Sequence, residues 1–518
     1  MKTNLNEYIP VIDLFAGPGG LGEGFSSLSS FKVVLSIEKD LAAHRTLELR
    51  NFYRQFEKHN VPDEYYQYLS NNITREKLFS SFPAEAEAAC AESWLAELGK
   101  TDEEIVDKRI ELALNGADYW VLIGGPPCQA YSIAGRSRNG EINAPDKRAY
   151  LYKEYLRIIA KHKPSVFVME NVKGLLSARS KGTNFFQKII EDLSKPSRLN
   201  SNASLNDKYD YILFSLSESS VFSQKSISEG LPEDFIVRSE NYGIPQARHR
   251  IFICGIQGNY KHIIPEVLQK QTPVSVRKVI SDLPRVRGGL SKIKDSSLSW
   301  VKILTSLKSE DWMQTDSKEI DDKIKKIILK TIKLVKPPKY DRGSERIRYK
   351  TKSEYKREWF CDPNLDVVCN HSTRGHLVDD LKRYFFAACF ALVKQKSPYL
   401  RDFPIKLLPN HSNVQKALQG SYFPDRFRVQ LANKPASTIT SHISKDGHYY
   451  IHYDPTQCRS LTVREAARLQ TFPDNYFFEG PRTEQYKQIG NAVPPLLALQ
   501  IAQIMRGLSK KLLEGHTM

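Results

Sequence analysis

Short apolar runs alternate with longer amphipathic stretches over the first third of the chain. The apolar runs have the length of buried strands, and they occupy Val11–Phe15, Lys32–Ile37, Tyr119–Ile123, Val166–Met169 and, further on, Ile251–Ile256. Stretches with helical spacing fill the intervals between them. Because strands that alternate with helices are typical of α/β proteins, we predict a doubly wound, Rossmann-like sheet.

The connection from Asn51 to Asn115 is unusually long and is rich in Glu, Ala and Lys. It predicts helices inserted on the flank of the sheet, of which Glu85–Leu98 and Asp102–Leu114 are the clearest.

The alternating pattern ends near residue 258 and returns only near Arg459. After that point the spacing predicts helices over Thr462–Leu469 and Leu496–Leu513. We therefore predict a first domain over residues 1–258, a smaller inserted domain over 259–458, and a return to the first domain over 459–518.

Charge narrows the choice of partner. The 76 Lys and Arg outnumber the 59 Asp and Glu, so the 518 residues carry a formal charge of +17, which favours a polyanion. The stretch Lys323–Arg357 concentrates this excess. No stretch approaches the roughly 20 apolar residues that span a bilayer. Met1–Pro10 also lacks a signal-peptide pattern. We expect a cytoplasmic protein with no membrane partner.

The seven cysteines are odd in number and scattered, so they do not suggest a disulfide framework. The residues that come nearest to a metal-ligand cluster are Cys361, Cys369, His371 and His376. Their spacing matches no standard zinc finger, and core thiols with polar histidines are the simpler interpretation. We predict no metal site.

A glycine-rich turn, Asp13–Gly20, follows the first predicted strand. Such a turn lets a ligand approach the backbone, with the N-terminus of a helix behind it. Many nucleotide-binding folds use similar turns, and the missing Gly-Lys-Ser/Thr argues against a phosphate loop. Glu38 ends the second predicted strand, where a carboxylate suits the two hydroxyls of a ribose.

Four further segments carry polar groups at strand ends or in tight turns. In chain order they are Gly124-Gly125-Pro126-Pro127-Cys128-Gln129, Glu170-Asn171-Val172, Gln246-x-Arg248-x-Arg250 and Gln488–Pro495. Strand ends in a doubly wound sheet face a common crevice, so these segments can converge. A nucleophilic thiol, a carboxyl group and an arginine are the groups needed to attack a cytosine ring and hold its polar edge.

These ordered motifs resemble those of the DNA cytosine-C5 methyltransferase family, over residues 11–255 and 459–495. The resemblance implies a fold in which the sheet binds S-adenosylmethionine and the inserted domain recognises the DNA target. The implied cofactor contacts are Phe15, Gly17, Gly19, Gly20, Glu38, Ile73, Pro127, Leu151, Asn491 and Val493. The chain departs from the family pattern at Asn72, where relatives often have Asp, and at Lys39, where some have an aromatic residue.

The resemblance also implies the chemistry. Cys128 would add to C6 of the cytosine, Glu170 would bind the N3 and N4 edge, Arg250 would hold O2, and Arg248 would support the site. The residues expected to contact DNA are Gln129, Ser132, Arg136, Arg138, Arg148, Gln246 and Thr438. The base would leave the helix before reaction, and the segment from Gln129 to Arg148 would close over the DNA.

Specificity is expected between about residues 260 and 458. Polar residues there that can reach base edges are Arg374, His376, Arg383 and Arg428, although solvated surfaces explain such residues equally well. The expected partners are double-stranded DNA and a restriction or phage-defence system encoded nearby, and the expected state is a prokaryotic, nucleoid-associated monomer.

Two rival functions stay open. A tRNA cytosine methyltransferase shares these motifs, but that family carries a Cys-Phe-Thr signature that this chain lacks, together with a more compact recognition region. A non-catalytic DNA-binding relative would lose the thiol, the carboxyl group or the glycine turn, and all of these are present here. DNA methylation is therefore the favoured prediction.

Overall fold

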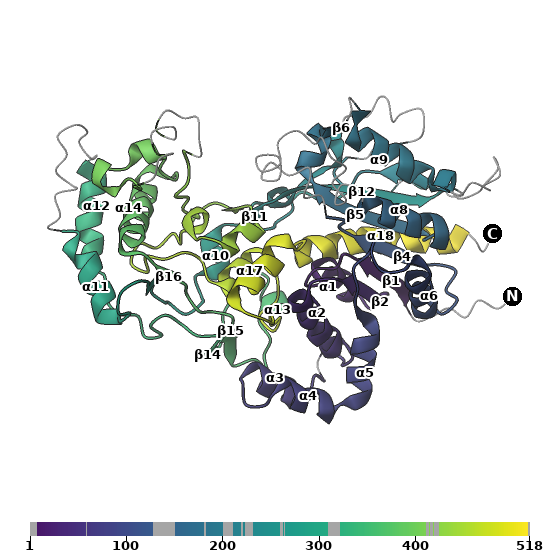
Figure 1. The fold of residues 1–518 in the computed structure, drawn as a ribbon, viewed down its shortest axis with the longest axis horizontal. Coiled ribbons are helices and arrows are strands. Elements are labelled where there is room, and N and C mark those ends of the chain that lie inside the picture. Colours follow the sequence, from purple (N-terminus) through teal and green to yellow (C-terminus); the bar gives the residue numbers. More distant parts are fainter. Residues whose placement is uncertain are drawn as a thin grey trace.

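The protein is described by a computed structural model over most of its length. The described residues are 8–58, 60–127, 151–180, 183–199, 211–218, 221–222, 232–258, 263, 265–308, 322–410, 414, 418 and 424–515. Figure 1 shows a lobe built on a large sheet and a second lobe built on the helices α11 (Ser297–Ser306), α12 (Asp322–Ile332) and α14 (Val378–Lys394). No helix in these ranges is both long enough and apolar enough to cross a membrane.

Nine strands form the large sheet within the described residues, in the order β3-β2-β1-β4-β5-β12-β8-β9, with β10 paired to β12. They are β1 (Ile9–Leu14), β2 (Phe31–Glu38), β3 (Ser93–Leu95), β4 (Val121–Gly124), β5 (Val166–Val172), β8 (Tyr211–Phe214), β9 (Val221–Phe222), β10 (Ile236–Arg238) and β12 (His249–Gln257). The strands from β3 to β5 run parallel, and β12 is antiparallel to both β5 and β8. The predicted doubly wound α/β sheet is confirmed.

Side chains on β1 alternate between two cores, one on each face of the sheet. Val11 packs into a core that also holds Phe25 of α1 (Gly20–Ser26) and Ile501 of α18 (Pro495–Gly515). Ile12 packs into the opposite core, with residues of α6 (Glu103–Leu114), α8 (Leu151–His162) and α9 (Phe185–Ser194). This two-residue period buries both faces of the sheet, as parallel sheets require.

The long connection after β2 is helical, as predicted, but one of its elements differs. Its helices are α2 (Leu41–Arg54), α3 (Asp63–Leu69), α4 (Arg75–Ser81), α5 (Pro83–Glu92) and α6. The prediction of one helix over Glu85–Leu98 was wrong beyond Glu92, because the chain there becomes the edge strand β3. Backbone pairing of β3 with β2 outweighs the helix propensity of this Ala-rich and Glu-rich stretch.

Helix α18, in the C-terminal segment, packs on the sheet lobe. Helix α18 lies against α1 so closely that a Cβ on Gly24 would sit 2.4 Å from the backbone of Ala498. Between the lobes lie α10 (Val276–Ile280), α13 (Arg357–Phe360), α16 (Val463–Leu469) and α17 (Arg482–Asn491). Two-stranded pairs are β6 (Arg179–Ser180) with β7 (Thr183–Asn184), β11 (Gln246–Ala247) with β17 (Ala436–Ser437), β13 (Gly289–Leu290) with β16 (Gly375–His376), and β14 (Arg346–Arg348) with β15 (Val367–Cys369).

The second lobe has its own apolar core. Trp300 of α11, Ile328 of α12 and Phe386 of α14 are buried there together. Parts of the predicted inserted domain belong elsewhere, since Val276 and Tyr450 pack into the core of the sheet lobe. The boundaries at residues 259 and 458 stay a prediction.

Candidate active site

The glycine turn after β1 is held in left-handed backbone conformations. Phe15, Gly17 and Gly19 have φ values of 56°, 58° and 87°, and α1 begins at Gly20. A Cβ on Gly20 would lie 2.3 Å from the carbonyl oxygen of Val493, so glycine is needed there for close packing. The turn therefore packs against the C-terminal motif Gln488–Pro495, and Val493 of that motif lies beside the turn.

Glu38, at the end of β2, faces the same turn. Its Oε2 accepts a hydrogen bond from the backbone N–H of Gly17 at 2.7 Å, and its Oε1 accepts from Lys39 and Asp40 at 2.9 and 2.8 Å. Burial raises the pKa of this carboxyl group, and the three amide donors oppose the rise. Oε1 is filled by its two donors, whereas Oε2 accepts one bond and keeps acceptor capacity for a ribose hydroxyl.

Strand β3 brings an unpredicted segment, Leu95–Gly99, to the carboxyl edge of the sheet. The N–H of Ala96 donates to the carbonyl oxygen of Glu38 at 3.0 Å, and Lys39 Nζ lies 3.2 Å from Glu97 Oε1. Leu151, a predicted cofactor contact, lies 3.2 Å from where a Cβ on Gly99 would stand. The side chain of Leu95 is 44% exposed beside this edge.

Ile73 lies elsewhere. It belongs to the turn between α3 and α4 and packs with Phe52, Tyr68 and Phe477, whereas Phe15 packs against the core that contains Leu14. A cofactor contact by Ile73 stays a prediction.

The carboxyl and arginine motifs meet on adjacent strands. Arg250 of β12 pairs in register with Val172 and therefore lies diagonally across from Glu170 of β5. Arg250 Nε stands 2.9 Å from Glu170 Oε1, and the two side chains are 14% and 12% exposed. This ion pair is sheltered, and both side chains keep some exposed surface.

The end of β4 lies against the same pair. A Cβ on Gly125 would sit 3.0 Å from Glu170 Oε2, and Asn171 Nδ2 donates to the carbonyl oxygen of Pro126 at 3.4 Å. The backbone that leads through Pro127 to Cys128 thus starts beside Glu170. The predicted nucleophile and loop contacts, Cys128, Gln129, Ser132, Arg136, Arg138 and Arg148, lie outside the described residues.

Arg248 is 2% exposed and ties three segments together. Its Nη1 donates to the carbonyl oxygens of Ile439 at 2.9 Å and Gly490 at 3.2 Å. Burial lowers the pKa of this guanidinium, Arg250 lowers it further, and Glu170 opposes the change. These contacts fix the Arg248 side chain against the backbone of Ile439 and Gly490, and a supporting role for it in the site stays a prediction.

Two residues predicted to contact DNA also have internal partners. Gln246 is fully buried and accepts a hydrogen bond from the N–H of Ile439 at 2.7 Å, so in this conformation its side chain supports the protein. Thr438 is half-buried and donates to the carbonyl oxygen of Ala247 at 2.6 Å. A DNA contact by Thr438 stays a prediction.

The C-terminal motif closes the site at the end of α17. Gln470 Nε2 donates to the carbonyl oxygens of Ile489 at 2.8 Å and Ala492 at 2.7 Å. Asn491, between them, is exposed. A Cβ on Gly490 would lie 2.2 Å from the backbone nitrogen of Ser441, so α17 packs directly on that backbone.

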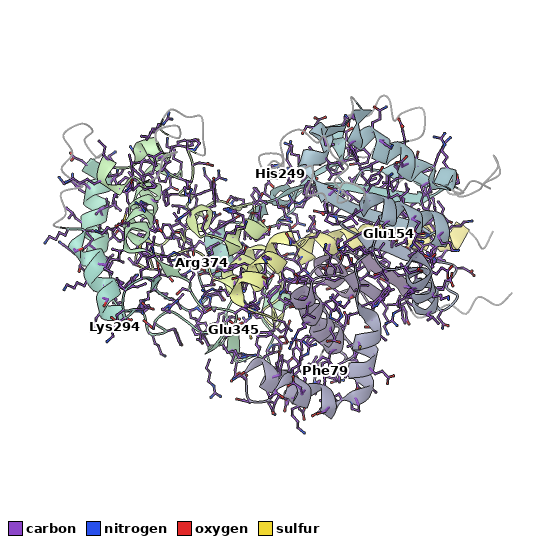
Figure 2. All side chains as sticks on the ribbon, in the orientation of Figure 1. Phe79, Glu154, His249, Lys294, Glu345 and Arg374 are labelled. Atoms are coloured by element: carbon purple, nitrogen blue, oxygen red, sulfur yellow. The ribbon has the colours of Figure 1, made fainter. Side chains whose placement is uncertain are left out.

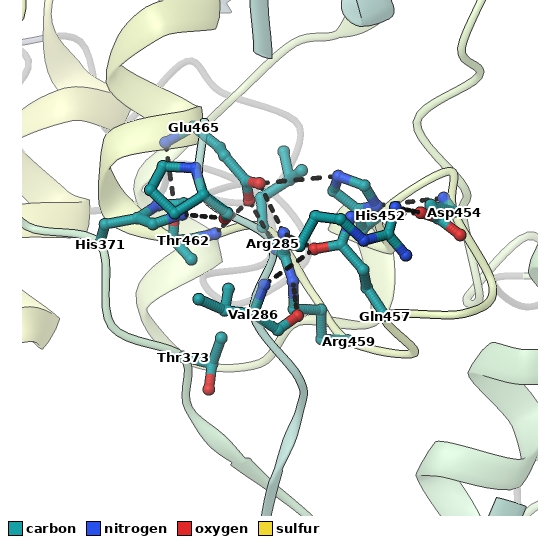
Figure 3. Close-up of polar contacts among 12 residues, drawn as sticks. Arg285, Val286, His371, Thr373, His452, Asp454, Gln457, Arg459, Thr462 and Glu465 are labelled. Atoms are coloured by element: carbon teal, nitrogen blue, oxygen red, sulfur yellow. Dashed lines mark hydrogen bonds and ion pairs between the residues drawn. The ribbon is translucent and has the colours of Figure 1, made fainter. Parts of the chain in front are cut away.

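A network of buried polar groups lies between the lobes (Figure 3). Arg459 forms a bidentate pair with Glu465, at 2.6 Å for both contacts, and His452 Nε2 stands 3.6 Å from the same carboxylate. Both ring nitrogens of His371 are engaged, with Thr462 Oγ1 and the carbonyl oxygen of Pro284 at 2.8 Å each. No cluster of three or more His, Cys, Asp or Glu suited to a metal occurs within the described ranges.

Comparison with known proteins agrees with this geometry. The model of the family described as C-5 cytosine-specific DNA methylase matches residues 81–196 and 234–506. The type II methyltransferase M.Bpa9945I of Bacillus paralicheniformis is 33% identical over 529 residues, which cover 98% of this chain and 99% of that protein. The DNA (cytosine-5-)-methyltransferase M.ApeKI of Aeropyrum pernix is 27% identical, with 95% and 97% covered.

The solved structures with a similar fold include one from a prophage. It is a DNA modification methyltransferase encoded within a prophage of E. coli, with a TM-score of 0.50 and 20% identity, and the match covers 97% of this chain and 99% of that one.

Proposed function

This chain belongs to the C-5 cytosine-specific DNA methylase family and is a DNA (cytosine-5-)-methyltransferase, and from this premise we propose how its residues carry out the reaction. The proposed reaction is S-adenosylmethionine-dependent methylation of cytosine C5 within one short double-stranded sequence. The target base leaves the helix and enters the space beside Glu170 and Arg250.

The residues at the carboxyl edge of the sheet fit S-adenosylmethionine. A Cβ at Gly17 would meet no atom within 4 Å, so the turn offers open space, and Glu38 presents a fixed carboxylate to a ribose. Leu95 and Leu151 supply apolar surface for an adenine on the β3 side, and Asn491 and Val493 close the opposite side. When bound, S-adenosylmethionine supplies an electrophilic methyl group.

The protein groups act on the cytosine ring. The thiolate of Cys128 forms a bond to C6, which makes C5 nucleophilic enough to take the methyl group. Glu170 hydrogen-bonds the N3 and N4 edge, and Arg250 donates to O2, so both hold the ring as its charge shifts. As the C5–methyl bond formed, the bond between the methyl group and the cofactor's sulfur would break and leave a neutral thioether. A water molecule would then take the C5 proton while the C6–S bond breaks, which would restore the aromatic ring and the thiolate.

The observation that carries this proposal is the Arg250–Glu170 ion pair beside the backbone that leads to Cys128. The pair presents a donor beside a carboxyl group, which matches the O2 acceptor and the N4 amino donor of cytosine, and N3 between them can accept the proton of the carboxyl group. Its partial exposure leaves one side for a base. Extruding that base costs a few kcal/mol, and closure of the segment from Gln129 to Arg148 would offset this cost.

We further propose that the enzyme protects host DNA within a restriction-modification system, because its relatives include a protein named as a type II methyltransferase. A nuclease with the same target sequence would be the partner. Methylation at one short motif is what this role requires.

Bisulfite sequencing of DNA from cells that express the chain tests the reaction and its specificity together. We expect 5-methylcytosine at one short motif, and none with the variant Cys128→Ala. Methylation that survives this substitution would contradict the covalent mechanism. Absence of DNA methylation despite soluble protein, with methylated cytosine in tRNA, would move the substrate to RNA.

A further inference from the structure

Three arginines from distant parts of the chain gather around one carbonyl group between the lobes. Arg342 Nη2 and Arg482 Nη1 both donate to the carbonyl oxygen of Thr373, at 2.9 and 2.8 Å. Arg374 follows Thr373 directly, and its guanidinium lies over the ring of Tyr486 at 4.8 Å. All three side chains are partly exposed.

The cluster carries more positive charge than its surroundings neutralise. Asp295 pairs with Arg342 at 2.8 Å, but it also pairs with Arg287 at 2.7 Å. Neither Arg374 nor Arg482 forms an ion pair with a carboxylate of the described residues. Burial lowers the pKa of Arg482, and Arg374 and Arg342 lower it further, while Tyr486 and Glu345 oppose the change. Such mutual repulsion is a cost unless an anion offsets it.

The cluster also has unused hydrogen-bond donors. Among the described residues, Nη1 of Arg374 and Nη2 of Arg482 have no acceptor, whereas both Nη atoms of Arg342 are engaged and the Nε atoms of Arg342 and Arg374 are buried out of reach of a ligand. A guanidinium presents its N–H groups in a planar fork that matches two oxygens of a phosphate. Unused donors on crowded cations are the features expected of an anion site before its ligand binds.

A short path connects the cluster to the cytosine site. Arg374 Nη2 donates at 2.5 Å to the carbonyl oxygen of Ile443, in the 3₁₀ helix η10 (Ser441–Ser444). The carbonyl oxygen of Ile439, four residues earlier, accepts a hydrogen bond from Arg248, which precedes Arg250 by two residues on the chain. Figure 2 shows Arg374 at the junction of the two lobes. A duplex bound to both lobes would pass near this junction.

We propose that Arg342, Arg374 and Arg482 form a binding site for a backbone phosphate of the substrate DNA, separate from the base pocket. This inference rests on the proposed function for its choice of DNA over other phosphates. The site would hold the duplex in register without reading sequence, because phosphate contacts position a protein on DNA.

The experiment measures affinity for a mixed-sequence DNA duplex as a function of salt, for the wild type, Arg374→Gln, Arg482→Gln and the double variant. Each lost phosphate contact should reduce the slope of log K against log salt by about 0.9 and weaken binding about fivefold at 0.15 M salt. The matched control is Arg348→Gln, because that arginine is 89% exposed and already paired with Asp366. It should leave the slope unchanged.

If the three arginines only stabilised the fold, measurements of melting temperature would give different results from those expected for a phosphate site. We expect inorganic phosphate to raise the melting temperature of the wild type more than chloride at equal ionic strength, and this gain to disappear in the double variant. An unchanged salt slope with a lower melting temperature would overturn the proposal, since the arginines would then only brace Thr373. Phosphate stabilisation without any change in DNA affinity would overturn the assignment to DNA. Because these measurements need no methyl transfer, their outcome is separate from that of the bisulfite experiment.

Discussion

Two arginine–carboxylate pairs in this protein have the same chemistry and different surroundings. Arg459 and Glu465 are 1% and 2% exposed, and Glu465 also accepts a hydrogen bond from the N–H of Thr462 at 2.8 Å. Arg250 and Glu170 are 14% and 12% exposed, with a single close contact of 2.9 Å. The first pair is closed on all sides by protein, while the second has room for another partner.

The difference indicates which pair stabilises the fold and which one serves the substrate. A buried pair that uses its lone pairs internally has nothing to offer a ligand, and removing one member leaves a charge without water or partner. A half-open pair tolerates such a loss better, because water can solvate the remaining group. Substitutions in the buried pair should therefore lower the free energy of unfolding. Substitutions in the open pair should instead lower the rate of methyl transfer.

The largest effect is expected for Arg459→Met, which leaves Glu465 buried without its main partner. We expect the free energy of unfolding in urea to fall by about 3–5 kcal/mol at neutral pH. The control is the double variant Arg459→Met with Glu465→Gln, which removes the charge but keeps a side chain that can cap α16. The double variant should be more stable than the single one, and equal losses would show that the charge itself is unimportant.

Glu170→Gln should lower the rate of methyl transfer strongly and the free energy of unfolding only slightly. The glutamine keeps the size of the side chain but cannot exchange a proton with N3, so single-turnover methyl transfer should slow by at least about 10²-fold, or roughly 3 kcal/mol. The free energy of unfolding should change much less than in Arg459→Met. A stability loss as large as that of the buried pair would remove the distinction between the two sites.

Acid should weaken the closed network around Arg459 and Glu465. Burial lowers the pKa of His452 from 6.5 to about 4, Arg459 lowers it further, and Glu465 opposes the change. Between these two values the unfolded chain binds more protons than the folded one, so stability is complete above pH 6.5 and falls as the pH drops toward 4. By pH 5 the loss from this histidine alone is about 2 kcal/mol.

Urea unfolding at pH 7.5 and pH 5 checks this window. In His452→Asn the amide oxygen can replace Nδ1 as the acceptor for the N–H of Asp454, but it cannot be protonated, so the difference between the two pH values should shrink. The matched control is His442→Asn, because that imidazole is 44% exposed. An unchanged difference in His452→Asn would remove His452 from the acid response.

Strong local patterns made much of the sheet lobe predictable. The strands β1, β2, β4, β5 and β12 each carry a clear apolar run, and Glu170 and Arg250 were identified by the order of their motifs. Their meeting follows from that fold class, because strand ends share one edge. Helix α18 was predictable for a similar reason, since its apolar positions recur at helical spacing.

Features that depend on long-range pairing were not predictable. Strand β3 is three residues long and exists through its register with β2, which nothing in its own residues indicates. The Arg459–Glu465 network and the arginines around Thr373 join segments that are far apart in the chain, so their partners are visible only after folding. From the sequence, Arg374 could be either a contact to a base edge or a solvated surface residue, and its charge did not decide between the two.

The smallest predicted effect extends the comparison of open and closed sites to apolar side chains. Leu95 is 44% exposed at the edge that holds Glu38, while Ile73 packs among Phe52 and Tyr68. If Leu95 covers part of the adenine, Leu95→Ala should weaken S-adenosylmethionine binding about fivefold, which corresponds to roughly 1 kcal/mol of buried apolar surface. Ile73→Ala should lower the free energy of unfolding and leave that affinity nearly unchanged. Calorimetric titration of both variants measures the affinity directly. A larger loss of affinity in Ile73→Ala would support the family-based assignment of Ile73 and contradict the role of Leu95.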